Sequence, residues 1–293
     1  VTVVDDFSVG RREFLARSQA RITIVDFHVG HAPADVVHLA GVLRGHDVVF
    51  HLAANPEARW GLENTFLDLE QNTLTTWAVL EAMRRSGARR FVLASSGTIY
   101  GDLADPVGED HGPLRPISLY GASKLASEGL ASAFAACFGQ RALVFRFGNV
   151  VGSRATHGAA LDFIKKLEAT PERLEVLGDG RQAKPYLHVS DCVAGMLFGV
   201  AHAASSFDCF NLAPEDVTSV SEIARAVVNE LGSDAQIVYT GGERGWPGDV
   251  PRSRLRPDKL AALGFRVRVS STEAMRRAVA EIVHERRASA CSS

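Results

Sequence analysis

Cysteine is scarce in this sequence, with four residues in 293, at positions 137, 192, 209 and 291. No two of them stand in the CxxC spacing of zinc-binding or redox motifs, and their neighbours are apolar or small. This pattern excludes a disulfide framework and predicts buried or incidental thiols in a reducing compartment. We therefore expect a cytoplasmic protein.

Long apolar runs and an excess of either charge are also missing. No apolar stretch approaches the ~18–20 residues that span a bilayer, and we expect neither a signal peptide nor a membrane partner. The formal net charge is −2 and the isoelectric point about 6.6. We expect no nucleic-acid partner, because such a partner would require a clustered basic face.

Two kinds of catalytic motif are absent as well. The ten histidines include His28 and His31, but they form neither an HExxH motif nor a compact His/Asp cluster, so we expect no metal site. No GxSxG nucleophile elbow occurs, which leaves Ser/His/Asp hydrolysis without support.

What the sequence does contain is an alternation of short β-rich runs with longer helical patterns. The predicted strands are residues 1–4, 21–25, 47–53, 89–96 and 142–147. Helical patterns over residues 65–86 and 118–138 end at Gly87 and Gly139, and glycine commonly ends a helix. Strands separated by helices predict an α/β fold with a doubly wound parallel sheet.

The regular alternation of strand and helix patterns ends after about residue 148. The turn-rich stretches GDGRQAKPY and GGERGWPGDVPRSR are separated by short helical patterns at residues 159–167, 221–231 and 272–287. We expect residues 1–148 to form the sheet domain. Residues 149–293 are expected to form mainly a smaller lobe, with some segments returning to the sheet.

The opening stretch VTVVDDFSVG has the pattern of a buried strand that ends in a turn. In a dinucleotide-binding fold the second strand ends in an acidic residue that binds the adenosine ribose, about 20 residues after a glycine loop. Asp5 or Asp6 fits that role, with Ser8 and Gly10 toward the phosphate, and an ordinary acidic turn explains these residues equally well. On the first interpretation a strand, the glycine loop and a helix, about 30 residues, precede Val1.

A second glycine pattern consists of Gly242, Gly245 and Gly248, after the β-rich run QIVYT. Pro247 and Pro251 interrupt this stretch, and no helical pattern begins whose N-terminal amides could face a pyrophosphate. We interpret this pattern as a coincidence.

The most informative stretch is YGASKLASE, residues 120–128. Tyr120 and Lys124 are four residues apart, so a helix places them on one face, where the ammonium group should lower a phenol pKa that is ~10 when unperturbed. A phenolate there can take a proton from a hydroxyl while a hydride leaves the same carbon. The spacing alone is common, and a surface pair on an ordinary helix is the alternative. The strand end LASSGTIYG adds Ser95, Ser96 and Thr98 at an edge where open α/β sheets bind ligands.

The motifs VDDFSVG, VVFHLAA, LASSGTIYG, YGASK, FRFGNVVG, GDGRQAKPYLHVSD and RGWPGDV occur in the order found in extended short-chain dehydrogenases/reductases. The chain resembles their NAD-dependent epimerase/dehydratase family, and in particular its UDP-glucose 4-epimerase-like members. The resemblance implies a Rossmann-type doubly wound parallel sheet, its first βα unit missing here, with a smaller α/β substrate-binding lobe. It also implies NAD as cofactor, a UDP-sugar as substrate, and a homodimer built from the helices at residues 65–86 and 118–138.

The same resemblance assigns roles to individual positions. It implies a catalytic trio of Ser96, Tyr120 and Lys124. The implied cofactor-binding residues are Asp5, Asp6, Ser8, Gly10, Asp26, Phe27, Leu52, Ala53, Ala54, Pro56, Asn72, Ser95, Tyr120, Lys124 and Phe147. The implied substrate-binding residues are Ser96, Thr98, Asn149, Lys184 and Arg244. Lys184 stands where many relatives carry arginine, and lysine binds phosphate without the bidentate fork. For Lys184 and Arg244 an ordinary surface-loop charge is the alternative.

The residues after Ser96 bear on the type of reaction. Relatives that eliminate water carry Asp-Glu there and decarboxylating relatives carry Glu, whereas this chain has Gly97 and Thr98, which supply no acid or base. This favours a UDP-hexose 4-epimerase that acts by transient oxidation at C4. A 4,6-dehydratase or other oxidoreductase of the family is one alternative, and a truncated, inactive sugar-nucleotide-binding protein is another.

The start at Val1 leaves three explanations open: a misassigned start, a trimmed or fragmentary gene, or a genuine short form without activity. Without a first strand the sheet exposes an apolar flank, and the pyrophosphate lacks a helix N-terminus. We therefore expect this polypeptide to bind NAD poorly and to be prone to aggregation. Micromolar binding in isothermal titration would contradict this expectation.

Overall fold

Four parallel strands form the central sheet, in the spatial order β10-β5-β4-β3. The computed structural model describes residues 1–103 and 105–290. The strands are β3 (Val48–His51), β4 (Arg90–Ser96), β5 (Arg141–Phe147) and β10 (Phe207–Leu212). Three of them were predicted from the sequence, and these predictions are confirmed. β10 comes from the second half of the chain.

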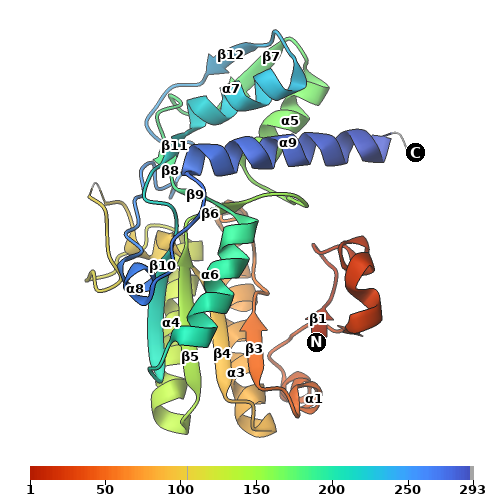
Figure 1. The fold of residues 1–293 in the computed structure, drawn as a ribbon, viewed down its shortest axis with the longest axis vertical. Helices are drawn as coiled ribbons and strands as arrows, with labels where there is room; N and C mark the ends of the chain where they lie inside the picture. The colour runs from red at the N-terminus through yellow and green to blue at the C-terminus, as the bar shows by residue number, and fades with distance from the viewer. Residues whose placement is uncertain (104, 291–293) are drawn as a thin grey trace.

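Helices cover both faces of this sheet (Figure 1). Successive residues of a strand point to opposite faces, so Ala142 and Val144 of β5 pack on one side, and Leu143 and Phe145 on the other. The first side carries α1 (Pro33–Leu43), α3 (Thr75–Ser86) and α4 (Leu119–Phe138), and the second carries α6 (Val189–His202) and α8 (Asp258–Leu263). The predicted α/β, doubly wound architecture is confirmed.

Two further strands form a small parallel sheet of their own. They are β1 (Thr2–Asp5) and β2 (Thr23–Asp26), joined by the 3-10 helix η1 (Arg12–Arg21). Within the described part of the chain β1 has no backbone pairing with β3, and Figure 1 shows the two apart. Val4 and Phe27 anchor the pair against the core on the α1 and α3 side. Phe50 and Leu52 are exposed at the β3 edge.

The helix predicted at residues 65–86 forms in two parts. A π-helical segment, η2 (Leu69–Leu74), runs directly into α3, which ends at Gly87 with a left-handed φ of 85°. The Glu70 carbonyl, which accepts the backbone N–H of Thr75 across the π turn, also accepts a hydrogen bond from Thr75 Oγ1 (3.1 Å). α4 begins at Ser118, whose hydroxyl caps the first turn, and ends at Gly139. Both predicted helix ends are confirmed.

The second half of the chain builds a lobe around a core of its own, in the upper part of Figure 1. Its strands are β6 (Asn149–Val151), β7 (Arg173–Val176), β8 (Ala183–Lys184), β9 (Tyr186–His188), β11 (Thr218–Ser219) and β12 (Gln236–Tyr239). Its helices are α5 (Ala159–Ala169), α7 (Val220–Leu231) and α9 (Ser271–Ala290), each within three residues of its predicted bounds. After β5 the chain therefore leaves the sheet and returns to it through α6, β10 and α8.

No helix within residues 1–103 and 105–290 is both long and apolar enough to cross a membrane. Cys192 and Cys209 are buried free thiols and Cys137 is an exposed one, while Cys291 lies outside the described residues.

Candidate active site

The carboxyl ends of β4 and β5 carry the candidate site. Ser96 is the last residue of β4 and is in register with Phe147, the last residue of β5. Tyr120 and Lys124 lie in the first two turns of α4, which packs on β4. The side chains of Ser96 and Tyr120 are hydrogen-bonded to each other. The fold thus brings together three side chains from two elements that are far apart in sequence.

The surroundings of this trio fix its orientation. Ser96 Oγ accepts hydrogen bonds from Thr98 N (3.2 Å) and Thr98 Oγ1 (2.9 Å), both from the short 3-10 helix η3 (Gly97–Tyr100). Lys124 Nζ donates to Ala94 O (3.0 Å) and lies 5.7 Å from the centroid of the Tyr120 ring. Tyr120 and Lys124 therefore share one face of their helix.

Burial dominates the electrostatics of the trio. It raises the pKa of Tyr120 to about 12, because the hydrogen bond with Ser96 offsets only part of it and the charge of Asp68 adds to it. Burial also lowers the pKa of Lys124 to about 8, against the opposing effect of Asp68. The prediction of a lowered phenol pKa is therefore wrong for this structure. Loss of solvation raises the phenol pKa, and the group that opposes it is Ser96; the ammonium group lies 5.7 Å from the ring centroid.

A buried polar layer supports the first turn of α4. Asn72 in η2 accepts from Asn55 N (2.8 Å) and donates to Ser123 Oγ (2.8 Å), and Ser123 donates to the Tyr120 carbonyl (2.8 Å). Asp68 accepts from the same Asn72 side chain (3.2 Å). Sequence reasoning missed Asp68. Its place four residues before Asn72, on the same face of a helix, is the signal that could have found it.

The predicted cofactor residues at the end of β1 form a tight acidic turn. Asp5 accepts the backbone N–H two residues further on (2.7 Å), and a Cβ on Gly10 would lie only 3.3 Å from its carboxylate. Asp6 accepts from Ser8 N (2.9 Å) and pairs with His28 (2.7 Å). Partial burial opposes ionisation of Asp6, but the hydrogen bonds from His28 and Ser8 outweigh it and lower the pKa to about 2.

At the end of β2 the predicted residues are engaged within the protein. Asp26 forms an ion pair with Arg12. Phe27 packs against the ring of His38, with centroids 4.5 Å apart, and against the core. The segment after β3 is more open: Leu52 and Ala53 are exposed, whereas Ala54 and Pro56 are half-buried.

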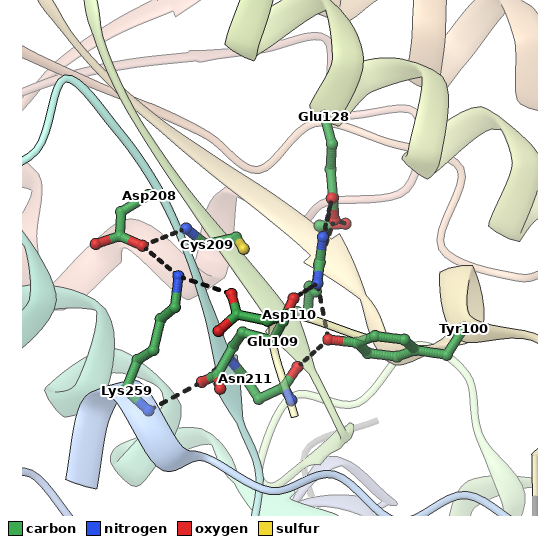
Figure 2. A network of polar contacts seen from close by, with 10 residues as sticks. Tyr100, Glu109, Asp110, Glu128, Asp208, Cys209, Asn211 and Lys259 are labelled. Atoms are coloured by element: carbon green, nitrogen blue, oxygen red, sulfur yellow. Dashed lines mark hydrogen bonds and ion pairs between the residues drawn. The ribbon is translucent and has the colours of Figure 1, made fainter. Parts of the chain in front are cut away.

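Ser95 faces the protein interior instead of the site. Its hydroxyl donates to Glu128 Oε1 (2.5 Å), and Glu128 is held by Arg146 (2.8 Å). Figure 2 shows Glu128 at one end of a polar network that continues through Tyr100 and Asn211. The network joins α4 to the strands that end at the site. Glu128 follows Lys124 by four residues, and this spacing is the signal that could have found it.

These residues fit NAD at both ends of the cofactor. The carboxylates of Asp5 and Asp6 stand at the end of β1, as a ribose requires. The segment at Leu52 and Ala53, which follows β3, is exposed. Lys124 retains donor capacity, because an ammonium group has three donors and Ala94 O is its one acceptor among the described residues.

A cavity opens beside the trio and joins the two lobes. Its lining includes four predicted substrate residues, Ser96, Thr98, Asn149 and Lys184, together with Phe147. The residues in the lining that sequence reasoning missed are Ala58, Gly97, Ser118, Gly148, Pro185, Trp246, Gly248, Asp249, Val250 and Ser253. Apart from Gly97 in η3 and Ser118 at the start of α4, they come from loops, where local patterns are weak.

The two predicted phosphate-binding cations are both paired with carboxylates of this protein. Lys184 Nζ lies 2.7 Å from Asp249 Oδ1, and the Asp249 carboxylate also accepts from Gly245 N (3.2 Å). Arg244 donates to the Asp249 carbonyl (2.6 Å) and pairs with Asp102. Lys184 reaches the cavity directly, whereas Arg244 braces the loop that carries Asp249.

A larger hollow, of about 480 Å³, lies between residues 106–111 and 256–262. Charged side chains of both signs line it, and Lys259 at its wall already pairs with Asp208 (3.0 Å). None of the predicted site residues lines it. The smaller cavity is the candidate site because Ser96 of the trio lines it, together with four other residues predicted for the site.

Two negative predictions bear on other sites. Gly242, Gly245 and Gly248 lie in a loop, and the next helix begins only at Asp258, so these glycines form no dinucleotide loop, as predicted. Within the described residues no group of three or more His, Cys, Asp or Glu side chains is placed to hold a metal ion.

Comparison with known proteins places this geometry in a family. Residues 10–213 match the NAD dependent epimerase/dehydratase family. The uncharacterized UDP-glucose epimerase YtcB of Bacillus subtilis (strain 168) is 30% identical over 215 residues, which cover 72% of this chain and 67% of that protein. A crystal structure of UDP-galactose 4-epimerase is 36% identical with a TM-score of 0.86, covering 97% of this chain and 90% of that one. A dTDP-glucose 4,6-dehydratase, the DesIV double mutant from Streptomyces venezuelae with NAD and DAU bound, is 25% identical with a TM-score of 0.85, covering 95% and 86%. The chain therefore belongs to the NAD-dependent epimerase/dehydratase family, and its cofactor is NAD.

Proposed function

We propose that the protein is an NAD-dependent UDP-hexose 4-epimerase. The observation that carries this proposal is the chemistry of the cavity wall. Next to Ser96 the wall consists of Gly97 and Thr98. The one carboxylate among the described lining residues, Asp249, is held by Lys184. The site thus has groups for oxidation of an alcohol but no free acid–base pair for elimination.

The trio supplies the proton transfer. Once ionised to the phenolate, Tyr120 takes the proton of the sugar C4 hydroxyl, and Ser96, aligned by Thr98, hydrogen-bonds the same oxygen. Lys124, with Asp5 and Asp6 at the other end, would hold NAD, which when bound would supply a hydride acceptor for C4 and the positive charge of an oxidised nicotinamide. Lys124 supplies a second positive charge, which is needed because burial raises the Tyr120 pKa to about 12. After the keto sugar rotates in the site, Tyr120 returns the proton to the C4 oxygen as the hydride returns to the opposite face of C4.

The substrate class is supported by the lining opposite the trio. Lys184 offers an ammonium group and Asn149 an amide to a diphosphate, and Trp246 offers a flat apolar face. The relatives named UDP-glucose epimerase and UDP-galactose 4-epimerase favour a UDP-hexose.

A nucleotide-sugar 4,6-dehydratase is the second candidate, favoured by the likeness to DesIV. Elimination of water across C5 and C6 requires a base and an acid at those carbons. Gly97 and Thr98 supply neither, so this candidate is the weaker one.

We also propose that the protein is a homodimer through α3 and α4. The outer face of α4 exposes small residues at helical spacing: Ala122, Ala126, Gly129 and Ala133. Such a face allows the backbone of a second helix to approach closely.

Turnover tests the proposal. The protein, produced with any residues its gene encodes ahead of Val1, is incubated with NAD and UDP-glucose, and UDP-galactose is sought by NMR. Tyr120→Phe should lower turnover by about 10²–10⁴-fold, as expected for loss of a general base. Tyr239→Phe is the matched control, because that hydroxyl is bonded to Ser221 in the other lobe (2.9 Å). Appearance of a 4-keto-6-deoxy sugar would establish the dehydratase instead, and binding without turnover would contradict both.

A further inference from the structure

A buried carboxylate, Asp68, lies behind the trio and takes no part in the proposed reaction. It stands just before η2 and is 1% exposed. Its Oδ1 accepts from the side-chain amides of Asn55 (2.9 Å) and Asn72 (3.2 Å). Its Oδ2 is buried and has no hydrogen-bond partner within residues 1–103 and 105–290.

Gly61 lies directly against that second oxygen. A Cβ at this position would lie 2.2 Å from Asp68 Oδ2, so the carboxylate packs directly on the backbone of the short helix α2 (Trp60–Glu63). A buried carboxylate with an unused oxygen is costly unless a positive charge nearby compensates it.

The matching positive charge is on Lys124. It is 4% exposed, and its ammonium group has a single hydrogen-bond acceptor in the part of the chain that the structure describes, Ala94 O. The Asn72 amide donates both to Asp68 and to Ser123, the residue before Lys124. Asn72 thus connects the buried anion to the turn of α4 that carries the buried cation, and both ions have unused bonding capacity. Each is within electrostatic reach of the other.

The other ionisable groups around Lys124 are neutral or already paired. His51 of β3 is buried, and burial together with the charge of Lys124 lowers its pKa to about 3. Glu128, one turn along α4, is bound by Arg146 through three hydrogen bonds. The phenol of the trio is neutral, since burial raises the Tyr120 pKa to about 12.

We propose that Asp68 is a positioning residue that holds the proton on Lys124 and so keeps an ammonium group beside Tyr120 at neutral pH. A lysine buried among neutral groups readily loses its proton, and a neutral amine neither favours a phenolate nor donates strongly to ribose hydroxyls. The same negative charge opposes ionisation of Tyr120. Asp68 therefore sets the resting pair as phenol plus ammonium. The inference rests on the proposed role of the trio, but its test does not require turnover.

Direct titration of Lys124 tests the inference. The chain has five lysines, so lysine labelled with ¹³C at Cε gives five signals, from Lys124, Lys165, Lys166, Lys184 and Lys259. Loss of one signal in Lys124→Met assigns it, and its pKa in the unmodified protein is expected at about 8. In Asp68→Asn that midpoint should fall by on the order of one unit. Glu70→Gln removes a carboxylate two residues further on and should leave the midpoint unchanged.

An unchanged or higher Lys124 midpoint in Asp68→Asn overturns the inference, and so does an equal fall in Glu70→Gln. If Asp68→Asn does not fold, the reciprocal measurement decides. Because the coupling between two sites is mutual, the carboxyl signal of Asp68 should titrate at higher pH in Lys124→Met, and an unchanged value overturns the inference. Epimerase turnover is measured separately, so its failure is distinguishable from failure of this proposal.

Discussion

Replacing Glu128 with glutamine should destabilise the fold strongly, because Glu128 neutralises a buried arginine. The side chains of Glu128 and Arg146 are 5% and 7% exposed. Glu128 accepts from Arg146 Nη2 (2.8 Å) and Nε (3.2 Å) and from Ser95 Oγ (2.5 Å). The network in Figure 2 thereby connects α4, β4 and β5 at a single point.

The size of the effect depends on the partners that Arg146 retains. Removing one partner of a buried ion pair typically costs about 3–5 kcal/mol, because the other charge stays buried without compensation. Arg146 Nη1 keeps the Tyr100 hydroxyl (2.8 Å) and the Glu109 carbonyl (2.9 Å) as acceptors. We therefore expect a loss at the low end of that range, about 3 kcal/mol. In the double variant Glu128→Gln/Arg146→Met the losses should not add, with a coupling above about 1 kcal/mol.

Urea unfolding, followed by the fluorescence of the three tryptophans, measures the free energy of unfolding. Glu273→Gln is the control, since Glu273 pairs with Arg276 and Arg277 on an exposed helix face and should matter little. A loss below about 1 kcal/mol for Glu128→Gln, typical of an exposed pair, would refute the reasoning. It would mean that Arg146 is solvated or finds another partner.

Two further predictions concern acid and assembly. Partial burial opposes ionisation of Asp6, but hydrogen bonds from His28 and Ser8 outweigh it and lower its folded-state pKa from 3.8 to about 2. Hydrogen bonds from Arg84 are the main reason that the folded-state pKa of Glu81 is lowered from 4.5 to about 2. The contribution of these two carboxylates to stability should be complete above about pH 4.5 and should be lost as the pH falls toward 2. In the double variant Asp6→Asn/Glu81→Gln the melting temperature should therefore fall less steeply between these two pH values. Ala126→Glu, on the exposed face of α4, should convert the proposed dimer to a monomer, as measured by light scattering. Ala262→Glu on α8 is the control and should leave the dimer intact. If the Ala126→Glu protein is still a dimer, the proposed interface is wrong.

Local patterns in the sequence were sufficient for three of the four strands of the central sheet, but not for β10, and for the pairing of Tyr120 with Lys124. Strand and helix bounds follow from apolar periodicity and from Gly87 and Gly139, which depend on neighbours within one or two turns. The placement of Tyr120 and Lys124 on one face follows from their spacing. The π-helical segment at Leu69–Leu74 was not predicted, since its pattern does not differ visibly from that of an α-helix.

Only the tertiary structure decided which distant side chains form hydrogen bonds and ion pairs, and how strongly buried groups such as Tyr120 keep their protons. Tyr100 and Asn211 are 111 residues apart, and Lys184 and Asp249 are 65 apart, so no local period could join them. The pKa of Tyr120 depends on how much solvent the packed elements remove, and this reversed the direction that its spacing from Lys124 had predicted. Secondary structure is encoded over short distances, whereas solvation and charge depend on the whole arrangement of packed elements.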